Sequence, residues 1–167
     1  MFKKILVCLD GSPASEAILP VVARAAEPGV EITLLTVANA PQGVVTERRP
    51  IYVGSVPAPG GVREIPAIRP VESRDQAIEH AIEVATEYLE GLAGILRNTG
   101  AKVSSHVAFG DSGEEIVNHA ECFEADVIMM ATHGRTALAE VVFGSVAAHV
   151  LRSGVRPVML VRPKELS

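Results

Sequence analysis

Two glycine-bearing segments in the C-terminal third of the sequence have the residue types and spacing of an anion-binding site. An apolar run at residues 127–130 leads into Thr-His-Gly-Arg at residues 132–135, and nine residues separate Gly134 from Gly144, which opens a helical pattern with Ser145. Backbone N–H groups at the start of a helix lack partners within the helix, and the positive end of the helix dipole lies there. Such helix starts bind phosphate. The sequence therefore predicts a phosphoryl-binding site at these two glycines.

Charged residues stand next to both ends of the predicted site. Asp10 follows the first apolar run, and its carboxylate either hydrogen-bonds hydroxyl groups of a ligand, caps the first helix or closes a turn with Ser12. Because a carboxylate repels phosphate, we expect it at the sugar end of a ligand. Arg135 either neutralises the phosphates or is a solvated loop cation. His133 is expected to contribute its backbone rather than acid–base chemistry.

Motifs of the common nucleotide-dependent enzymes and hydrolases are missing from the sequence. No Gly-Lys-Ser/Thr follows a predicted strand, the first strand lacks Gly-x-Gly-x-x-Gly, and Ser145 is not part of a Gly-x-Ser-x-Gly elbow. The remaining histidines show no metal-ligand spacing with cysteines or carboxylates: His80, His106, His119 and His149. A slow ATPase or phosphotransferase stays open as an alternative, with His133 or Asp10 as the general base.

Length and composition limit the class of protein. The chain has 167 residues, 48% of them hydrophobic, as expected for one globular domain with a full core. The formal net charge of −5 argues against a nucleic-acid partner. The apolar run at residues 5–9 is too short for a signal peptide or a membrane span, so we expect a cytoplasmic protein without a membrane partner. Cys8 and Cys122 both look buried.

Short apolar runs alternate with helical patterns along the chain. The expected strands occupy residues 5–9, 31–37, 102–108, 126–131 and 157–161, the third being more polar and therefore suited to an edge. Helices are expected to follow Ser12, Ser73, residues 110–112 and Gly144, and a further short helical stretch is expected just before Gly144. Pro20 lies inside the first helical pattern and is expected to kink or distort it.

This alternation predicts an α/β fold. We expect a single doubly wound sheet of five parallel strands with helices on both faces. Ligands of such sheets bind at the carboxyl ends of strands where the winding direction reverses. If the loops that hold Asp10 and Gly134 share a ligand, the first and fourth strands are neighbours. That condition favours the strand order 3-2-1-4-5 over the flavodoxin-like order 2-1-3-4-5.

Residues 41–71 interrupt the alternation of strands and helices. They are rich in proline and glycine and show no periodicity. We expect an irregular surface insertion there, within one domain that spans residues 1–167.

The residues that predict the phosphate site also resemble the signature of the universal stress protein family. After the fourth strand that signature has a glycine, two residues, a second glycine, nine residues and Gly-Ser or Gly-Thr. Gly134 and Gly144 with Ser145 match it, and Ala131 stands in place of the first glycine. The segment from residue 7 to residue 12 and the last strand are also similar to the family's, so the resemblance covers residues 2–163.

The resemblance implies a protein of the ATP-binding subgroup that acts in stress responses through nucleotide occupancy. ATP, or AMP or ADP, would place its phosphates at the two glycines, its ribose at Asp10 and its adenine at Val37. Mg²⁺ or Mn²⁺ would be carried by the phosphates, because the sequence offers no cluster of carboxylates. The candidate binding residues are Leu9, Asp10, Val37, Met130, Ala131, Gly134, Arg135, Gly144, Ser145 and Val146.

The resemblance also implies a homodimer through the last strand, at Val158, Met159, Leu160 and Val161. Some members of the family bind no nucleotide, so a nucleotide-free homodimeric interaction protein of the same fold is the main alternative. Ala131 is the best sequence argument for that alternative, because its methyl group would keep a phosphate away from the backbone.

Overall fold

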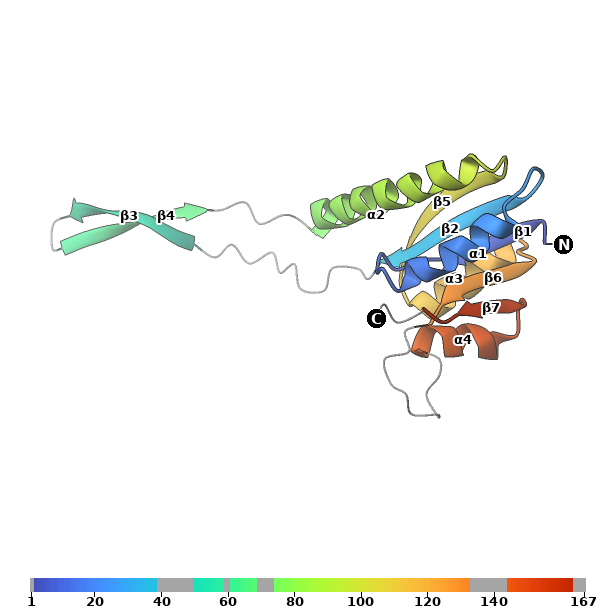
Figure 1. Ribbon diagram of the computed structural model, residues 1–167. Coiled ribbons are helices and arrows are strands. Elements are labelled where there is room, and N and C mark those ends of the chain that lie inside the picture. The colour runs from blue at the N-terminus through green and yellow to red at the C-terminus, as the bar shows by residue number, and fades with distance from the viewer. Residues whose placement is uncertain (1, 39–49, 59–60, 69–73, 133–143, 164–167) are drawn as a thin grey trace. The chain divides into compact units, whose positions relative to one another are not determined.

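The computed structural model describes residues 2–38, 50–58, 61–68, 74–132 and 144–163. The chain divides into two compact units, residues 1–40 with 81–167, and residues 41–80. The first unit contains one sheet of five parallel strands in the order β5-β2-β1-β6-β7 (Figure 1). Its strands are β1 (Lys4–Cys8), β2 (Glu31–Ala38), β5 (Lys102–Phe109), β6 (Val127–Ala131) and β7 (Val158–Val161). Counted along these five strands, the order is 3-2-1-4-5, so the predicted fold class and topology are confirmed.

The helices of the fold begin close to the predicted positions. They are the 3-10 helix η1 (Ser15–Ile18), α1 (Leu19–Ala25), α2 (Arg74–Arg97), α3 (Ser112–Cys122) and α4 (Ser145–Ser153). Pro20 lies in the first turn of α1, where its missing N–H group costs no hydrogen bond. The expected distortion is confirmed, because a 3-10 segment precedes α1. Among the described helices, none combines the length and apolar character that a membrane crossing requires.

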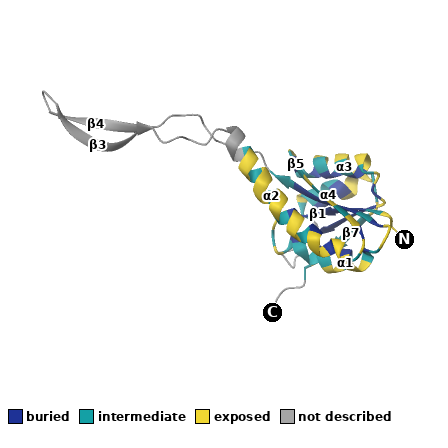
Figure 2. Cartoon of the chain, turned by 90° about the horizontal axis from the view of Figure 1, so that it is seen from above, coloured by how far each residue is buried: buried dark blue, intermediate teal, exposed yellow. Residues whose placement is uncertain are grey.

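Each face of the sheet has its own apolar core. Alternate residues of β1 point to opposite faces, so Ile5 and Val7 belong to one core and Leu6 and Cys8 to the other. The first core contains buried residues of η1, α1 and α2, and the second contains buried residues of α3 and α4. In Figure 2 the buried residues concentrate in the sheet and on the inner sides of these helices. Because helices cover both faces, functional groups are positioned at the ends and edges of the sheet.

The second unit contains a two-stranded antiparallel sheet of β3 (Pro50–Ala58) and β4 (Gly61–Ile68). We expected no regular element between residues 41 and 71, and for these two segments that expectation is wrong. Both strands of a two-stranded sheet are edge strands, where proline is tolerated because its missing N–H group can face away from the partner. The single domain over residues 1–167 stays a prediction, and the short helical stretch expected before Gly144 lies outside the described residues.

The two edges of the five-stranded sheet differ. β5 forms one edge, as predicted for the polar strand, and Arg97 of α2 donates from Nε and Nη2 to the carbonyl of Val103 at 3.2 and 3.0 Å. Glu90 accepts from the same guanidinium at 2.9 Å and holds it in place. β7 forms the other edge, and its four apolar residues are all half-buried. The β5 edge is therefore covered in part by the side chain of Arg97 at the end of α2.

Candidate functional site

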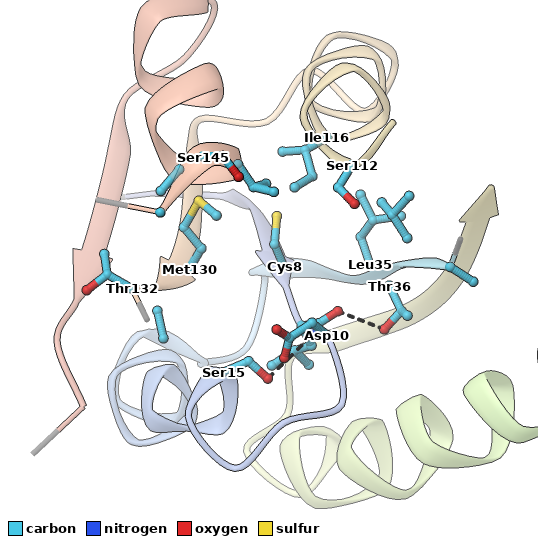
Figure 3. Close-up of a pocket in the computed structure, with 17 residues that line it drawn as sticks. Cys8, Asp10, Ser15, Leu35, Thr36, Ser112, Ile116, Met130, Thr132 and Ser145 are labelled. Carbon is cyan, nitrogen blue, oxygen red and sulfur yellow. Dashed lines mark hydrogen bonds between the residues drawn. The ribbon is translucent and has the colours of Figure 1, made fainter. Parts of the chain in front are cut away.

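A cavity of about 620 Å³ lies at the carboxyl ends of the central strands. Residues from the ends of β1, β2 and β6 and from the first turns of η1, α3 and α4 line it (Figure 3). Its volume is within the range of small-molecule sites, about 300–1,000 Å³. β1 lies between β2 and β6, and the helices that follow β1 and β6 cover opposite faces. The cavity is therefore at the point where the winding of the sheet reverses.

The fold brings the candidate binding residues together from four separate segments. Those that the structure describes all line this one cavity: Leu9, Asp10, Val37, Met130, Ala131, Gly144, Ser145 and Val146. Gly134 and Arg135 lie outside the described residues. Their places at the site therefore stay predictions.

The turn after β1 is held by its own hydrogen bonds. The amide of Ser12 donates to Oδ1 of Asp10 at 2.9 Å, and the amide of Ser15 donates to Oγ of Ser12 at 3.1 Å. The hydroxyl of Ser15 donates to the carbonyl of Ser12 at 2.8 Å. Gly11 has φ of 78°, a conformation that favours glycine. Of the interpretations of Asp10, the structure contains the turn with Ser12, and this turn holds the exposed carboxylate at the wall of the cavity.

The start of α4 has a different character. Gly144 is the N-cap residue, and among the residues that the structure describes no side chain caps the helix with a hydrogen bond. The carbonyl of Gly144 accepts from the amide of Ala148 at 2.9 Å, whereas the amides of Ser145, Val146 and Ala147 have no acceptor within the helix. A Cβ atom at Gly144 would meet no described atom within 4 Å. This first turn therefore borders the cavity with amide groups, beside a glycine that no described atom crowds.

The floor of the cavity is apolar. Cys8, Leu35, Ile116 and Met130 line it, and Figure 3 shows the sulfur atoms of Cys8 and Met130 on the side of the sheet that carries Ser145 and Ile116. Burial raises the pKa of the Cys8 thiol to about 12. The thiol therefore stays protonated at neutral pH and is a poor nucleophile. A flat, apolar group of a ligand would be favoured on this floor.

The two cysteines have different environments. Cys8 is buried, as predicted, but Cys122 is exposed, so the expectation for Cys122 was wrong. The buried residues of α3 include Ile116 and Ala120, four residues apart. Cys122 follows Ala120 by two residues and so lies off this buried stripe.

Several cavity residues were not predicted from the sequence. Thr36 and Ala38 flank the predicted residue Val37 on β2, and the rule that ligands bind at strand ends would have found them. Ser112 and Ile116 come from α3, and only the position of that helix over the sheet reveals them. In the part of the chain that the structure describes, no group of three or more His, Cys, Asp or Glu side chains is placed to hold a metal ion.

Comparison with known proteins gives a consistent result over the whole chain. The family model described as "Universal stress protein family" matches residues 1–162. Universal stress protein MJ0577 of Methanocaldococcus jannaschii is 30% identical over 98% of this chain and 97% of its own length. Universal stress protein YxiE of Bacillus subtilis is 30% identical over 97% of this chain and 100% of its own length.

Solved structures show the same fold. The structure of MJ0577 covers 99% of both chains at 28% identity, with a TM-score of 0.72. An Arabidopsis thaliana family protein with AMP bound covers 98% of this chain and 93% of its own, at 15% identity and a TM-score of 0.59. An Archaeoglobus fulgidus universal stress protein in complex with dAMP covers 94% of this chain and 95% of its own, at 21% identity and a TM-score of 0.54.

Proposed function

We propose that this chain, which belongs to the universal stress protein family, binds an adenine nucleotide in the cavity at the carboxyl ends of β1, β2 and β6. One observation carries the proposal: helix α4, which begins at Gly144 with first-turn amides that have no acceptor within the helix, and the apolar strand ends border the same cavity. Helix-start amides stabilise phosphate oxygens, and the apolar floor suits a purine ring. The combination fits a ligand with a charged end and a flat, apolar end.

Each part of the nucleotide has proposed partners. The amides at Gly144, Ser145 and Val146 hold the phosphates, and the Ser145 hydroxyl donates a further hydrogen bond. Asp10 accepts hydrogen bonds from the ribose, and the backbone of Val37 frames the adenine. Leu9, Met130 and Ala131 complete the cavity wall, and Gly134 and Arg135 are proposed to add phosphate contacts.

Solved structures of similar proteins support the choice of an adenine nucleotide as the ligand. The Arabidopsis thaliana protein was solved with AMP and the Archaeoglobus fulgidus protein with dAMP. We extend the ligand class to ATP and ADP, with Mg²⁺ or Mn²⁺ carried by the phosphates, since such ions are commonly bound through substrate phosphates. Occupancy of the site, rather than hydrolysis, is the proposed output in a cytoplasmic stress response.

The identity of any bound ligand is the first test. Freshly purified protein is denatured with heat or acid, and the released small molecules are separated by chromatography. Isothermal titration of ligand-free protein with AMP, ATP–Mg²⁺, GTP–Mg²⁺ and tripolyphosphate then measures selectivity. We expect adenine nucleotides to bind at least tenfold more tightly than GTP. An empty extract, with no binding and no thermal shift on addition of ATP–Mg²⁺, would instead support the nucleotide-free interaction protein.

We also propose that the chain forms a homodimer through β7. The amide of Ile128 bonds to the carbonyl of Pro157, and the amide of Thr132 bonds to the carbonyl of Val161, each at 2.9 Å. Because backbone groups alternate along a strand, those of Leu160 face away from β6, toward the side of β7 on which the structure describes no further strand. An apolar strand with an open edge is a template for pairing with a second strand.

A pair of variants at Leu160 tests the dimer. Leu160→Pro removes the outward N–H group as well as the side chain, whereas Leu160→Ala removes the side chain alone. We expect multi-angle light scattering to find the wild type and Leu160→Ala as dimers and Leu160→Pro as a monomer, with circular dichroism confirming that both variants are folded. A folded Leu160→Pro dimer would contradict pairing through this edge.

A further inference from the structure

Two hydrogen bonds, joined through the backbone between Ser15 and Glu16, connect the cavity to helix α2. Asp10 and Ser15 both line the cavity, and the amide of Asp10 donates to the Ser15 hydroxyl at 3.4 Å. Glu16 follows Ser15 in η1, and its Oε1 accepts from the hydroxyl of Tyr88 at 3.1 Å. Tyr88 lies on α2, 72 residues farther along the chain. The turn that holds the candidate ribose-binding carboxylate is therefore joined to a distant helix.

The surroundings of Tyr88 fix its hydroxyl as the donor in the hydrogen bond to Glu16. Its ring packs against the apolar core that α1 and α2 share, and Ser15 is 4% exposed. Burial, and then the hydrogen bond to Glu16, raise the pKa of Tyr88 to about 12, and the charge on Asp10 acts in the same direction. The phenol therefore stays protonated at neutral pH and donates its hydrogen bond. It also lies within the electrostatic influence of the carboxylate at the cavity.

Tyr88 occupies a particular place along α2. Leu89, Ala93 and Leu96, which follow it, are buried in the core, whereas residues 82–84, which precede it, are exposed. Tyr88 is therefore the first along α2 of the described side chains that pack in or against this core.

We propose that Tyr88 is a positioning residue for the nucleotide site and transmits occupancy of the cavity to helix α2 through Glu16 and the turn that carries Asp10. This inference rests on the proposed function, because it needs a ligand at Asp10. When the ribose engages the carboxylate, the turn becomes more rigid. The Tyr88–Glu16 hydrogen bond then becomes more persistent and orders the neighbouring part of α2.

Hydrogen–deuterium exchange of the full chain, with and without AMP, tests the proposal. In the wild type we expect AMP to slow exchange in peptides covering residues 10–18 and residues 81–92. Tyr88→Phe and Glu16→Ala both remove the hydrogen bond, so AMP should still protect residues 10–18 but no longer residues 81–92, and affinity should fall about threefold. Glu16→Gln keeps an acceptor oxygen and should retain both effects.

Two further variants separate coupling from a general loss of stability. Thr99→Val removes a hydroxyl that donates to the carbonyl of Leu96 at 2.7 Å just beyond the end of α2, away from the two hydrogen bonds that connect the cavity to α2. We expect it to keep the AMP-dependent protection of residues 81–92. The double variant of Tyr88→Phe with Glu16→Ala should lose no more affinity than either single variant, since both remove one interaction.

The possible failures are distinguishable. If AMP protects residues 81–92 equally in the wild type and in Tyr88→Phe, or leaves them unchanged in a wild type that binds AMP, the coupling is overturned and the nucleotide site stands. If the wild type binds neither AMP nor ATP–Mg²⁺, the proposed function fails and the coupling fails with it.

Discussion

The turn after β1 and the start of α4 border the same cavity, yet they meet the hydrogen-bonding needs of their backbones in different ways. In the turn, Asp10 and Ser12 accept from the amides of Ser12 and Ser15. At the start of α4, the N-cap residue is Gly144, and no side chain of the described residues caps the helix. The amides of Asp10, Ser12 and Ser15 thus have acceptors within the first segment, whereas the helix provides no acceptors for the first amides of the second segment.

This difference indicates separate roles for the two segments. An anion at α4 meets amides that the helix leaves without acceptors, so its binding displaces no helical hydrogen bond. A ligand at Asp10 meets a carboxylate that is already held in a turn, which makes the group well oriented but adds less binding free energy. We therefore expect α4 to supply most of the affinity and the turn to supply selectivity for the sugar.

The largest effect is expected for Gly144→Val. The backbone of Gly144 has φ of −57° and ψ of 164°, which any residue adopts, and no described atom crowds its Cβ position. The fold should be unaffected, while the isopropyl group occupies space that the phosphates need. We expect affinity for ATP–Mg²⁺, measured by titration calorimetry, to fall about 100-fold, or about 2.7 kcal/mol.

Gly91→Val is the matched control for this experiment. Gly91 is exposed on α2, and a Cβ there also meets no described atom within 4 Å. The same substitution is therefore made far from the cavity lining, and we expect wild-type affinity and a folded protein. Unchanged affinity in Gly144→Val would show that the start of α4 does not hold the ligand.

Asp10→Ala is expected to have an intermediate effect that depends on the ligand. Hydrogen bonds to a charged group contribute about 1.5–3 kcal/mol, and the lower end of that range predicts that AMP binds a little more than tenfold more weakly. Tripolyphosphate has no ribose, and its affinity should change by less than about twofold. Ser12→Ala loosens the same turn but keeps the carboxylate, and should destabilise the fold by about 1 kcal/mol with a smaller loss for AMP. Equal losses for AMP and tripolyphosphate in Asp10→Ala would remove the ribose role.

Much of the five-stranded sheet was predictable because its signals are local. Apolar runs, N-cap residues and the break at Pro20 mark the elements. The observed pairing of β1 with β6 was predicted from the hypothesis that the loops after the first and fourth strands share a ligand. The β3–β4 hairpin was missed because its prolines argue against strands in general. Proline is tolerated in a strand that has one partner and not in a strand that has two. The number of partners depends on the rest of the fold, so the local sequence does not reveal it.

The candidate site was predictable in part for a similar reason. Asp10 follows β1, Val37 lies near the carboxyl end of β2 and Gly144 opens α4, so topology alone brings them to one end of the sheet. The contribution of Ser112 depends on where α3 lies over the sheet. The bond between Tyr88 and Glu16 depends on the packing of α2 against η1. Contacts that arise from helix placement leave no spacing pattern in the sequence.

The smallest effect is expected at Ala131, where the family signature has glycine. Ala131 ends β6, pairs with Val161 and is 7% exposed at the cavity wall. If its methyl group holds the phosphates away from the backbone, Ala131→Gly should raise the affinity for ATP–Mg²⁺ about threefold. The same change should lower the free energy of unfolding by about 0.5–1 kcal/mol, because glycine in a strand costs conformational entropy.

Ala131→Val extends the series in the opposite direction and should weaken ATP–Mg²⁺ more than it weakens adenosine, which has no phosphates. A graded order of affinity from Gly to Ala to Val, measured by titration calorimetry, would place the phosphates between Ala131 and the start of α4. Equal affinities across the three proteins would mean that α4 holds the phosphates without the end of β6. In that case the turn after β1 and the start of α4 would bind the nucleotide without a contribution from the end of β6.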